Sequence, residues 1–217
     1  GQWSGEPLSI EISTNERGAN IHAKGRASIA ELRHFYDLPV FEQLSGRTDW
    51  QAAVLMRDGK LDLNLSSDLR GITSALPDPF NKGAATSMPL SLTRQNMSSG
   101  GRKSPGAVEQ VWRMSLGNAA AGLLVMNSRG QLLRGRIVVG TGQSQPNPDM
   151  LGLQLESLKP VDLDFWLRAM GLSQAKQRGG ATARTQVPPL AISLKAPMLK
   201  AFGRKFQDFR ASVQTTA

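Results

Sequence analysis

The sequence contains no cysteine and only two histidines in 217 residues. Without cysteine, the chain has neither a disulfide framework nor a thiolate for metal or nucleophilic chemistry. His22 and His34 lack His, Asp or Glu partners at the spacing of a zinc site or facial triad, so we expect both to be structural or surface residues. No apolar run reaches the roughly 18 residues of a membrane-spanning helix. The start, GQW, lacks the order of a signal peptide and indicates a piece of a longer protein.

Sequence motifs of enzymes are also missing. Residues 140–145, GTGQSQ, lack the Lys-Ser/Thr pair of a phosphate loop and do not open a helix after a buried strand. There is no G-x-S-x-G nucleophile elbow. Asp58 and Asp78 are explained by turns, and Asp62 by a polar strand face. We therefore expect no enzymatic activity, no cofactor and no metal.

The charge is strongly basic, with 26 Lys+Arg against 17 Asp+Glu and a formal net charge of +9. Such a balance favours anionic partners, among them nucleic acid, anionic lipid headgroups and lipopolysaccharide. The basic residues are scattered, which is typical of a solvated polar face rather than of a nucleic-acid groove. Trp50, Trp112 and Trp166 could stack on bases, but aromatic side chains in alternating strands more often pack in a core.

Residues 50–66 predict a β-hairpin with one apolar face. Asp58 and Gly59 supply the two positive-φ positions of a type I′ turn, which pairs Arg57 with Lys60. That register places three cross-strand pairs on the apolar face: Met56 with Leu61, Val54 with Leu63, and Ala52 with Leu65. The opposite face pairs Leu55 with Asp62, Ala53 with Asn64 and Gln51 with Ser66, and is mostly polar.

Alternating patterns predict strands along most of the chain. Residues 8–14 and 19–28 form a second candidate hairpin, residues 88–93 a strand, and residues 111–140 a three-strand meander. Short helices are expected after a capping box of Ser28 and Glu31, at residues 39–44, and after Asp162 or Asp164. The predicted fold class is mainly β: an antiparallel, meandering and strongly curved sheet, either a groove or a partly open barrel, with a few short helices.

A series of motifs follows in a characteristic order. Gly46, Thr48 and Trp50 precede the hairpin, and SSDLRG (residues 66–71) and LPDPFNK (76–82) follow it. Further along come LLRGRIVVG (132–140), GLQLESLKPVDLDFWLRAM (152–170) and LAISLKAPMLKAFGRKFQDFRASV (190–213). The second of these carries an L-D-x-x-W element in Leu163, Asp164 and Trp166, but Trp166 stands two rather than three residues after Asp164. The order of these pieces, over most of the chain after Leu44, resembles the bacterial AsmA-like proteins, specifically their YhdP-like branch.

The resemblance implies a segment of a large periplasmic protein of Gram-negative bacteria that is anchored in the inner membrane. Such proteins are understood to form a long sheet curled into an apolar groove that moves phospholipid toward the outer membrane. We expect this piece itself to be soluble, with phospholipid or another acyl lipid and other envelope proteins as partners, and no nucleic acid. The lipid-facing candidates are Val54, Met56, Leu61, Leu63, Leu65, Leu90 and Leu92, and the headgroup candidates are Arg57, Arg70, Arg134 and Arg136.

The expected organisation is one AsmA-like segment over residues 1–217, with two sub-units at 1–95 and 107–217 and a flexible basic linker near 173–189. Two other functions stay open at this point. One is a basic β-domain that binds nucleic acid, and the other is a structural envelope-assembly module whose apolar face is fully covered by its own chain.

Overall fold

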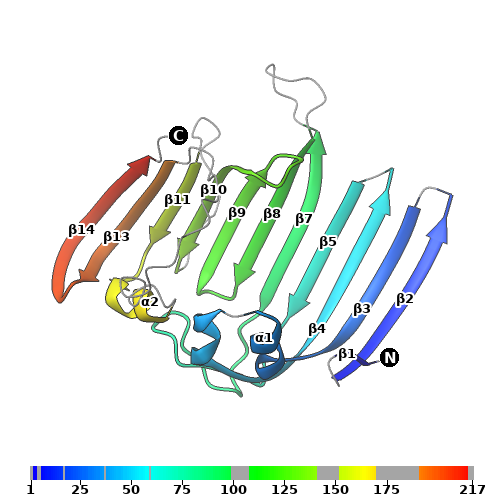
Figure 1. The fold of residues 1–217 in the computed structure, drawn as a ribbon, viewed down its shortest axis with the longest axis horizontal. Helices are drawn as coiled ribbons and strands as arrows, with labels where there is room; N and C mark the ends of the chain where they lie inside the picture. Colours follow the sequence, from blue (N-terminus) through cyan, green and yellow to red (C-terminus); the bar gives the residue numbers. More distant parts are fainter. Residues whose placement is uncertain are drawn as a thin grey trace, which may run out of the picture.

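The computed structural model describes residues 2–3, 6–16, 18–36, 38–58, 60–98, 108–140, 152–169 and 191–214. Their strands form one fourteen-stranded sheet that is open, with the strands side by side in a single layer (Figure 1). The first half of the chain contributes β1 (Gln2–Trp3), β2 (Glu6–Asn15), β3 (Gly18–Ser28), α1 (Ile29–Phe35), the 3-10 helix η1 (Pro39–Gln43), β4 (Leu44–Arg57), β5 (Lys60–Ser67), β6 (Ile72–Ser74) and β7 (Leu90–Ser98). The second half contributes β8 (Val108–Leu116), β9 (Ala120–Met126), β10 (Leu132–Val139), β11 (Gly152–Ser157), β12 (Val161–Asp162), α2 (Leu163–Ala169), β13 (Ala191–Ala201) and β14 (Arg204–Gln214).

The predicted hairpin registers are confirmed. In β4 and β5, Arg57 pairs with Lys60, Val54 with Leu63 and Ala52 with Leu65, and Asp58 has a φ of +50°, as the turn requires; Gly59 lies outside the described residues. The second hairpin joins β2 to β3. Strands β8, β9 and β10 form the expected antiparallel meander. Turn chemistry and side-chain alternation therefore determine the local pairing over most of the sheet.

The mainly β fold is confirmed, and the sheet is mixed rather than antiparallel throughout. Strand β11 runs parallel to β10 and to β13, and β12 also pairs with β13 in parallel. Antiparallel pairing returns only between β13 and β14. Alternation specifies which face a side chain takes but not the direction of a strand, because it reads the same in both directions.

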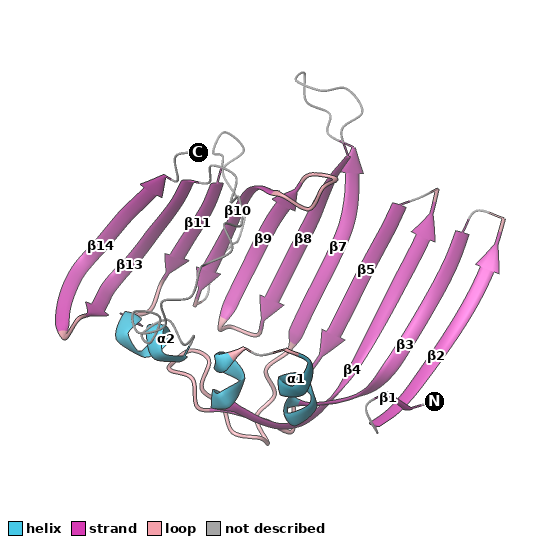
Figure 2. Cartoon of the chain, viewed as in Figure 1, coloured by secondary structure: helices cyan, strands magenta, loops and turns pink. Residues whose placement is uncertain are grey.

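The helices lie together at one end of the strands (Figure 2). Helix α1 begins after Ser28, as predicted, but the Ser28 side chain makes no capping hydrogen bond, so the expected capping box does not form. At α2, the Asp162 Oδ1 accepts a hydrogen bond from the Phe165 N–H at 2.8 Å and so caps the helix. Among the described residues, no helix has the length and apolar character needed to cross a membrane.

Helix α2 is tied to the turn between β13 and β14. The Asp164 carboxylate accepts hydrogen bonds from the Phe202 N–H at 2.7 Å and the Gly203 N–H at 3.1 Å, and these donors lower the pKa of Asp164. Lys200 lies 2.9 Å from the Asp162 carboxylate. These contacts join the start of α2, with Asp162 and Asp164, to the C-terminal hairpin, from which it is distant in the sequence.

Two glycines allow β4 to approach β6. A Cβ on Gly46 would lie 1.9 Å from the Gly71 carbonyl oxygen, and a Cβ on Gly71 would lie 2.0 Å from the Arg47 carbonyl oxygen. Both glycines have positive φ, +104° and +88°. Only glycine suits this pair of positions, which accounts for glycine at the start of the first motif and at the end of SSDLRG.

The face opposite the predicted apolar residues is not polar along the whole sheet. Val111, Val125 and Val138 are buried on it, and Val138 is only 1% exposed. In the centre of the sheet, at β8 to β10, both faces therefore carry apolar side chains. The linker predicted near residues 173–189 lies outside the described residues.

Candidate functional site

One face of the sheet is apolar across successive strands. Register places all seven sequence-predicted apolar residues on it, since Leu63 and Leu65 pair with Val54 and Ala52 on one side, and Leu65 pairs with Leu92 on the other. The same face continues in both directions through the following residues: Leu8, Ile10 and Ile12 of β2, Ile21 of β3, Trp112 and Met114 of β8, Leu124 of β9, Ile137 of β10, Leu153 and Leu155 of β11, and Leu194 of β13. We call this surface the apolar face.

Side chains of the apolar face are only partly buried. Ile12 is 66% exposed, Ile10 and Met56 are also exposed, and Val54, Leu63 and Leu92 are half-buried. A surface patch of this size is unusual for a protein that works alone in water, because burial of apolar area is the main favourable term in folding. The apolar face therefore has the properties of a binding surface.

At the helical end, the apolar face deepens into a pocket of about 620 Å³. Its floor comes from the sheet and its walls from α1 and from residues 68–89. The apolar lining includes Leu8, Trp50, Leu65, Leu90, Ile29, Leu32, Ile72, Leu76 and Phe80. Trp166 of α2 packs edge-on against Phe80, with 5.6 Å between the ring centroids.

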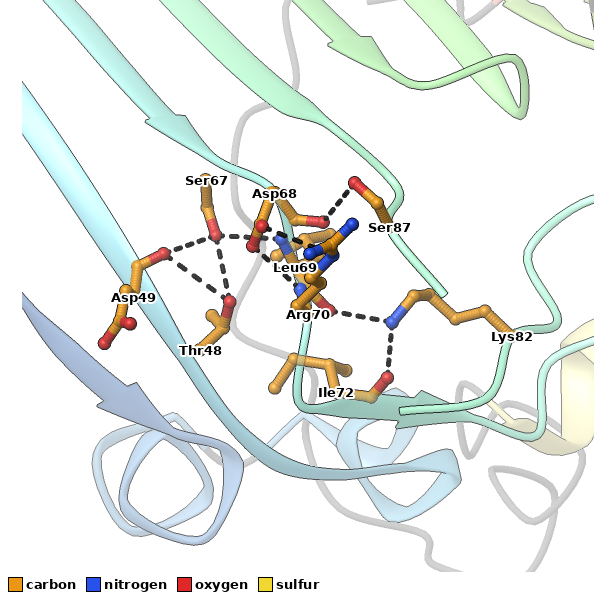
Figure 3. A network of polar contacts seen from close by, with 9 residues as sticks. All are labelled: Thr48, Asp49, Ser67, Asp68, Leu69, Arg70, Ile72, Lys82 and Ser87. Atoms are coloured by element: carbon orange, nitrogen blue, oxygen red, sulfur yellow. Dashed lines mark hydrogen bonds and ion pairs between the residues drawn. The ribbon is translucent and has the colours of Figure 1, made fainter. Parts of the chain in front are cut away.

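A buried lysine holds the wall of this pocket in place. Lys82 lines the pocket and is only 6% exposed, and its Nζ donates hydrogen bonds to the carbonyl oxygens of Leu69, at 2.7 Å, and Ile72 (Figure 3). Burial lowers the pKa of Lys82, while the nearby Asp68 carboxylate acts in the opposite direction. The final lysine of LPDPFNK thus fastens the turn after β5 to the segment that follows it.

Ser67 organises the other half of the same network. Its Oγ donates to the Asp49 carbonyl oxygen at 2.6 Å and accepts a hydrogen bond from the Leu69 N–H at 3.1 Å, and the Thr48 Oγ1 lies 3.1 Å away (Figure 3). The Asp68 Oδ1 accepts from the Arg70 N–H at 2.9 Å, which stabilises the turn. The motif residues at 66–71 therefore build part of the wall of the pocket.

The four headgroup candidates do not gather in one place. Arg57 is exposed at the opposite end of β4, and Arg70 lies on the turn, 3.8 Å from Asp68. Arg134 pairs with Glu109 at 2.9 Å and Arg136 pairs with Glu156, both on the face opposite the apolar face. Their assignment to headgroups stays a prediction, and their placement lends it no support.

Sequence reasoning missed two features of the site, one on the apolar face and one in the pocket wall. Arg94 of β7 lies between Leu63 and Trp112 in register, with its guanidinium carbon 5.7 Å from the centroid of the Trp112 ring. The Arg94 Nε and the Trp112 Nε1 are both buried and have no hydrogen-bond partner. Extending the alternation of Leu90 and Leu92 by one step would have found the arginine. The burial of Lys82 had no comparable signal, because it depends on contacts distant in the sequence.

The polar side chains offer no centre for metal chemistry in the ranges that the structure describes, where no three His, Cys, Asp or Glu side chains gather as metal ligands would. Both His22 and His34 are exposed. The carboxylates of lowered pKa are held by structural partners: Lys195 and then Arg136 lower the pKa of Glu156, and Lys200 and then the Phe165 N–H lower the pKa of Asp162.

Comparisons with known proteins agree with the order of motifs in the sequence. No curated protein and no solved structure gives a significant match. A family model described as YhdP protein matches residues 1–217, which include the hairpin, the pocket wall and the C-terminal strands. The YhdP-like resemblance of the motifs is therefore confirmed, and the chain belongs to the YhdP family.

Proposed function

We propose that this chain is a non-enzymatic segment of a bacterial envelope protein that holds the acyl chains of lipids against the apolar face of its sheet. The observation that carries the proposal is the continuity of this face from β2 to β13, with side chains still partly exposed and with a pocket at one end. Membership of the YhdP family supports it.

The proposed mechanism is passive. Each CH₂ group that leaves water for an apolar environment gains about 0.8 kcal/mol, so an acyl chain lying along several strands binds without any covalent step. The polar headgroup remains near water. A row of similar side chains along the face also lets the acyl chain slide, because neighbouring positions offer nearly the same contact.

The resemblance of the motifs to AsmA-like proteins supplies the setting of the proposal. In that setting, the chain is part of a larger membrane-anchored protein on the periplasmic side of the inner membrane, and its lipid is a phospholipid on its way to the outer membrane. The nucleic-acid alternative is less favoured, because Arg134 and Arg136 are already paired with carboxylates.

A photoreactive amino acid at two positions tests the proposal. Leu63 lies on the apolar face, and Ala53, on the neighbouring strand, lies on the opposite face. In cells, we expect a photoreactive side chain at position 63 to crosslink to phospholipid and the same side chain at position 53 to give none.

Leu63→Asp and Ala53→Asp then separate an open binding face from a covered core. On an open face, Leu63→Asp should reduce lipid capture at least tenfold and leave thermal unfolding nearly unchanged, while Ala53→Asp keeps both. In a covered core, the carboxylate would instead cost several kcal/mol and unfold the chain. Strong destabilisation by Leu63→Asp, together with no lipid at either photoreactive position, would contradict the proposal and favour a structural assembly module.

A further inference from the structure

Arg94 is a cation on a surface that is otherwise suited to hydrocarbon. Its register partners are Leu63 and Trp112, and Leu92 precedes it on the same face. None of these neighbours carries a carboxylate. The ion pair of Glu109 in β8 with Arg134 in β10 lies on the opposite face. The charge of Arg94 is therefore left without a counter-charge from its neighbours on the apolar face.

Two hydrogen-bond donors at this place have no acceptor. The Arg94 Nε and the Trp112 Nε1 are buried and unpaired, and the guanidinium lies over the indole ring with 5.7 Å to its centroid. Buried donors are nearly always satisfied in folded proteins, so each exception calls for an explanation. An anionic oxygen of a bound molecule that reaches the guanidinium would balance the charge of Arg94 and offer an acceptor to its N–H groups.

The position relative to the pocket fits a molecule with a tail. Leu90 lines the pocket, and Arg94 stands four residues further along β7, about 13 Å away at the rise of a strand. Leu92 lies between them on the same face. A molecule with its anionic group at Arg94 could therefore run its hydrocarbon over Leu92 and into the pocket.

We infer that Arg94 and Trp112 form an anchoring site for the phosphodiester of a phospholipid whose acyl chains extend along the apolar face toward the pocket. The inference rests on the proposed function. It replaces the four scattered headgroup candidates with one defined point on the apolar face itself. Guanidinium groups suit this task, because their planar set of N–H donors matches the oxygens of a phosphate.

Equilibrium binding of two lipids with the same acyl chains tests the inference. The probes are dioctanoyl phosphatidylglycerol and dioctanoylglycerol, each titrated as a monomer into the full chain and followed by tryptophan fluorescence. We expect the phospholipid to bind about tenfold more tightly, the ratio that one charge-assisted hydrogen-bonded contact provides. Arg94→Gln should abolish that ratio and leave the affinity for dioctanoylglycerol unchanged.

Two further variants keep the test interpretable. Arg113→Gln makes the same charge change one residue beyond Trp112, on the opposite face, where Arg113 bonds to Gln95, and it should keep the ratio. Trp112→Phe keeps a ring beneath the guanidinium but weakens the cation–π contact that orients it, and it should lower the ratio about threefold. Circular dichroism checks that each variant is folded.

The outcomes separate the inference from the proposed function. Equal affinity of the unmodified chain for the two lipids, or a ratio that survives in folded Arg94→Gln, would overturn the anchoring site and leave acyl-chain binding intact. Glycerol phosphate competing as well as the phospholipid would overturn the assignment to a lipid. Failure of both lipids to bind would overturn the proposed function and the anchoring site with it.

Discussion

Lys82 shows how a single side chain can support a binding surface without touching a ligand. Its ammonium lies between two backbone carbonyls at the wall of the pocket, and burial lowers its pKa. A charge in such a place is tolerated because its donors are used. The lysine of LPDPFNK therefore has a structural role, since it binds the backbone of the pocket wall.

Replacing Lys82 by methionine should lower the free energy of unfolding by about 1–3 kcal/mol, because the Leu69 and Ile72 carbonyls lose their donor. For a chain of this size, each kcal/mol corresponds to about 2–4 °C in the midpoint of thermal unfolding. Circular dichroism during heating measures the shift. Lys60→Met, at an exposed strand end, is the matched control and should stay within about 0.5 kcal/mol of the unmodified chain. Equal midpoints for the two variants would show that the buried contacts contribute little.

Glu156 gives the stability a defined dependence on pH. Hydrogen bonds from Lys195 and Arg136 lower its pKa in the folded chain, whereas an unfolded glutamate takes up its proton near pH 4.3. Between these two values the unfolded state binds more protons, so the stabilisation is complete above about pH 4.3 and is lost as the pH falls through the folded pKa.

Comparison with Glu156→Gln isolates this contribution. We expect the unmodified chain to be the more stable of the two at neutral pH, and the difference in their free energies of unfolding to shrink as the pH falls from about 5 to about 3. Urea unfolding at several pH values measures the difference. Asp162 and Asp164 also have lowered pKa values, but they are present in both proteins and cancel in the comparison. A difference that stays constant with pH would contradict this role of the carboxylate.

At the scale of elements, the contact between β4 and β6 positions part of the wall of the pocket. Strand β4 pairs with β3 and β5 along the sheet, and its first residues pair with the short β6. Gly46 and Gly71 make this second pairing possible through their positive φ and their close approach to the neighbouring backbone. Ile72 of β6 then reaches the pocket.

Gly71→Ala should destabilise the chain by about 2 kcal/mol or more, because alanine must adopt a positive φ and its Cβ would lie 2.0 Å from the Arg47 carbonyl oxygen. Gly83→Ala is the matched control, since a Cβ there meets nothing within 4 Å. It should be neutral or slightly stabilising. Chemical denaturation measures both, and similar stabilities would argue against a strained contact at Gly71.

At the scale of the whole molecule, the chain can interact with a lipid surface in two ways, through its net charge and through its apolar face. The net charge of +9 attracts anionic headgroups over a range set by salt, with a screening length of about 10 Å at 0.1 M. The apolar face acts only on contact and does not depend on screening in the same way. Ionic strength can therefore distinguish docking at a membrane from holding of a lipid.

Flotation with vesicles should detect the electrostatic attraction alone. We expect the chain to bind phosphatidylglycerol vesicles at low salt and to be released at about 1 M salt, where the screening length falls to about 3 Å. Neutral phosphatidylcholine vesicles provide the control and should recruit little protein at either salt concentration. Binding to anionic vesicles that resists high salt would instead show that apolar contact dominates.

Much of the local structure was predictable from the sequence. The β4–β5 register followed from Asp58, Gly59 and the alternation around them, and the β2–β3 hairpin and the β8–β10 meander followed from similar signals. The seven apolar candidates share one face because alternation and register are local properties. The family was also recognisable, since the order of motifs is a property of the sequence alone.

The tertiary structure decided what depends on contacts between distant residues. The parallel pairing of β11 with β10 and β13 follows from the path of the chain, and alternation contains no information about strand direction. The burial of Lys82 requires its side chain to meet the backbone of residues ten and thirteen positions earlier in the sequence. Arg94 can be recognised as a candidate site only from the register, which places Leu63 and Trp112 on either side of it. The tertiary structure also shows that the Arg94 Nε and the Trp112 Nε1 are buried without a hydrogen-bond partner. Local periodicity therefore determined which side chains share a face, and long-range pairing determined which of them form a site.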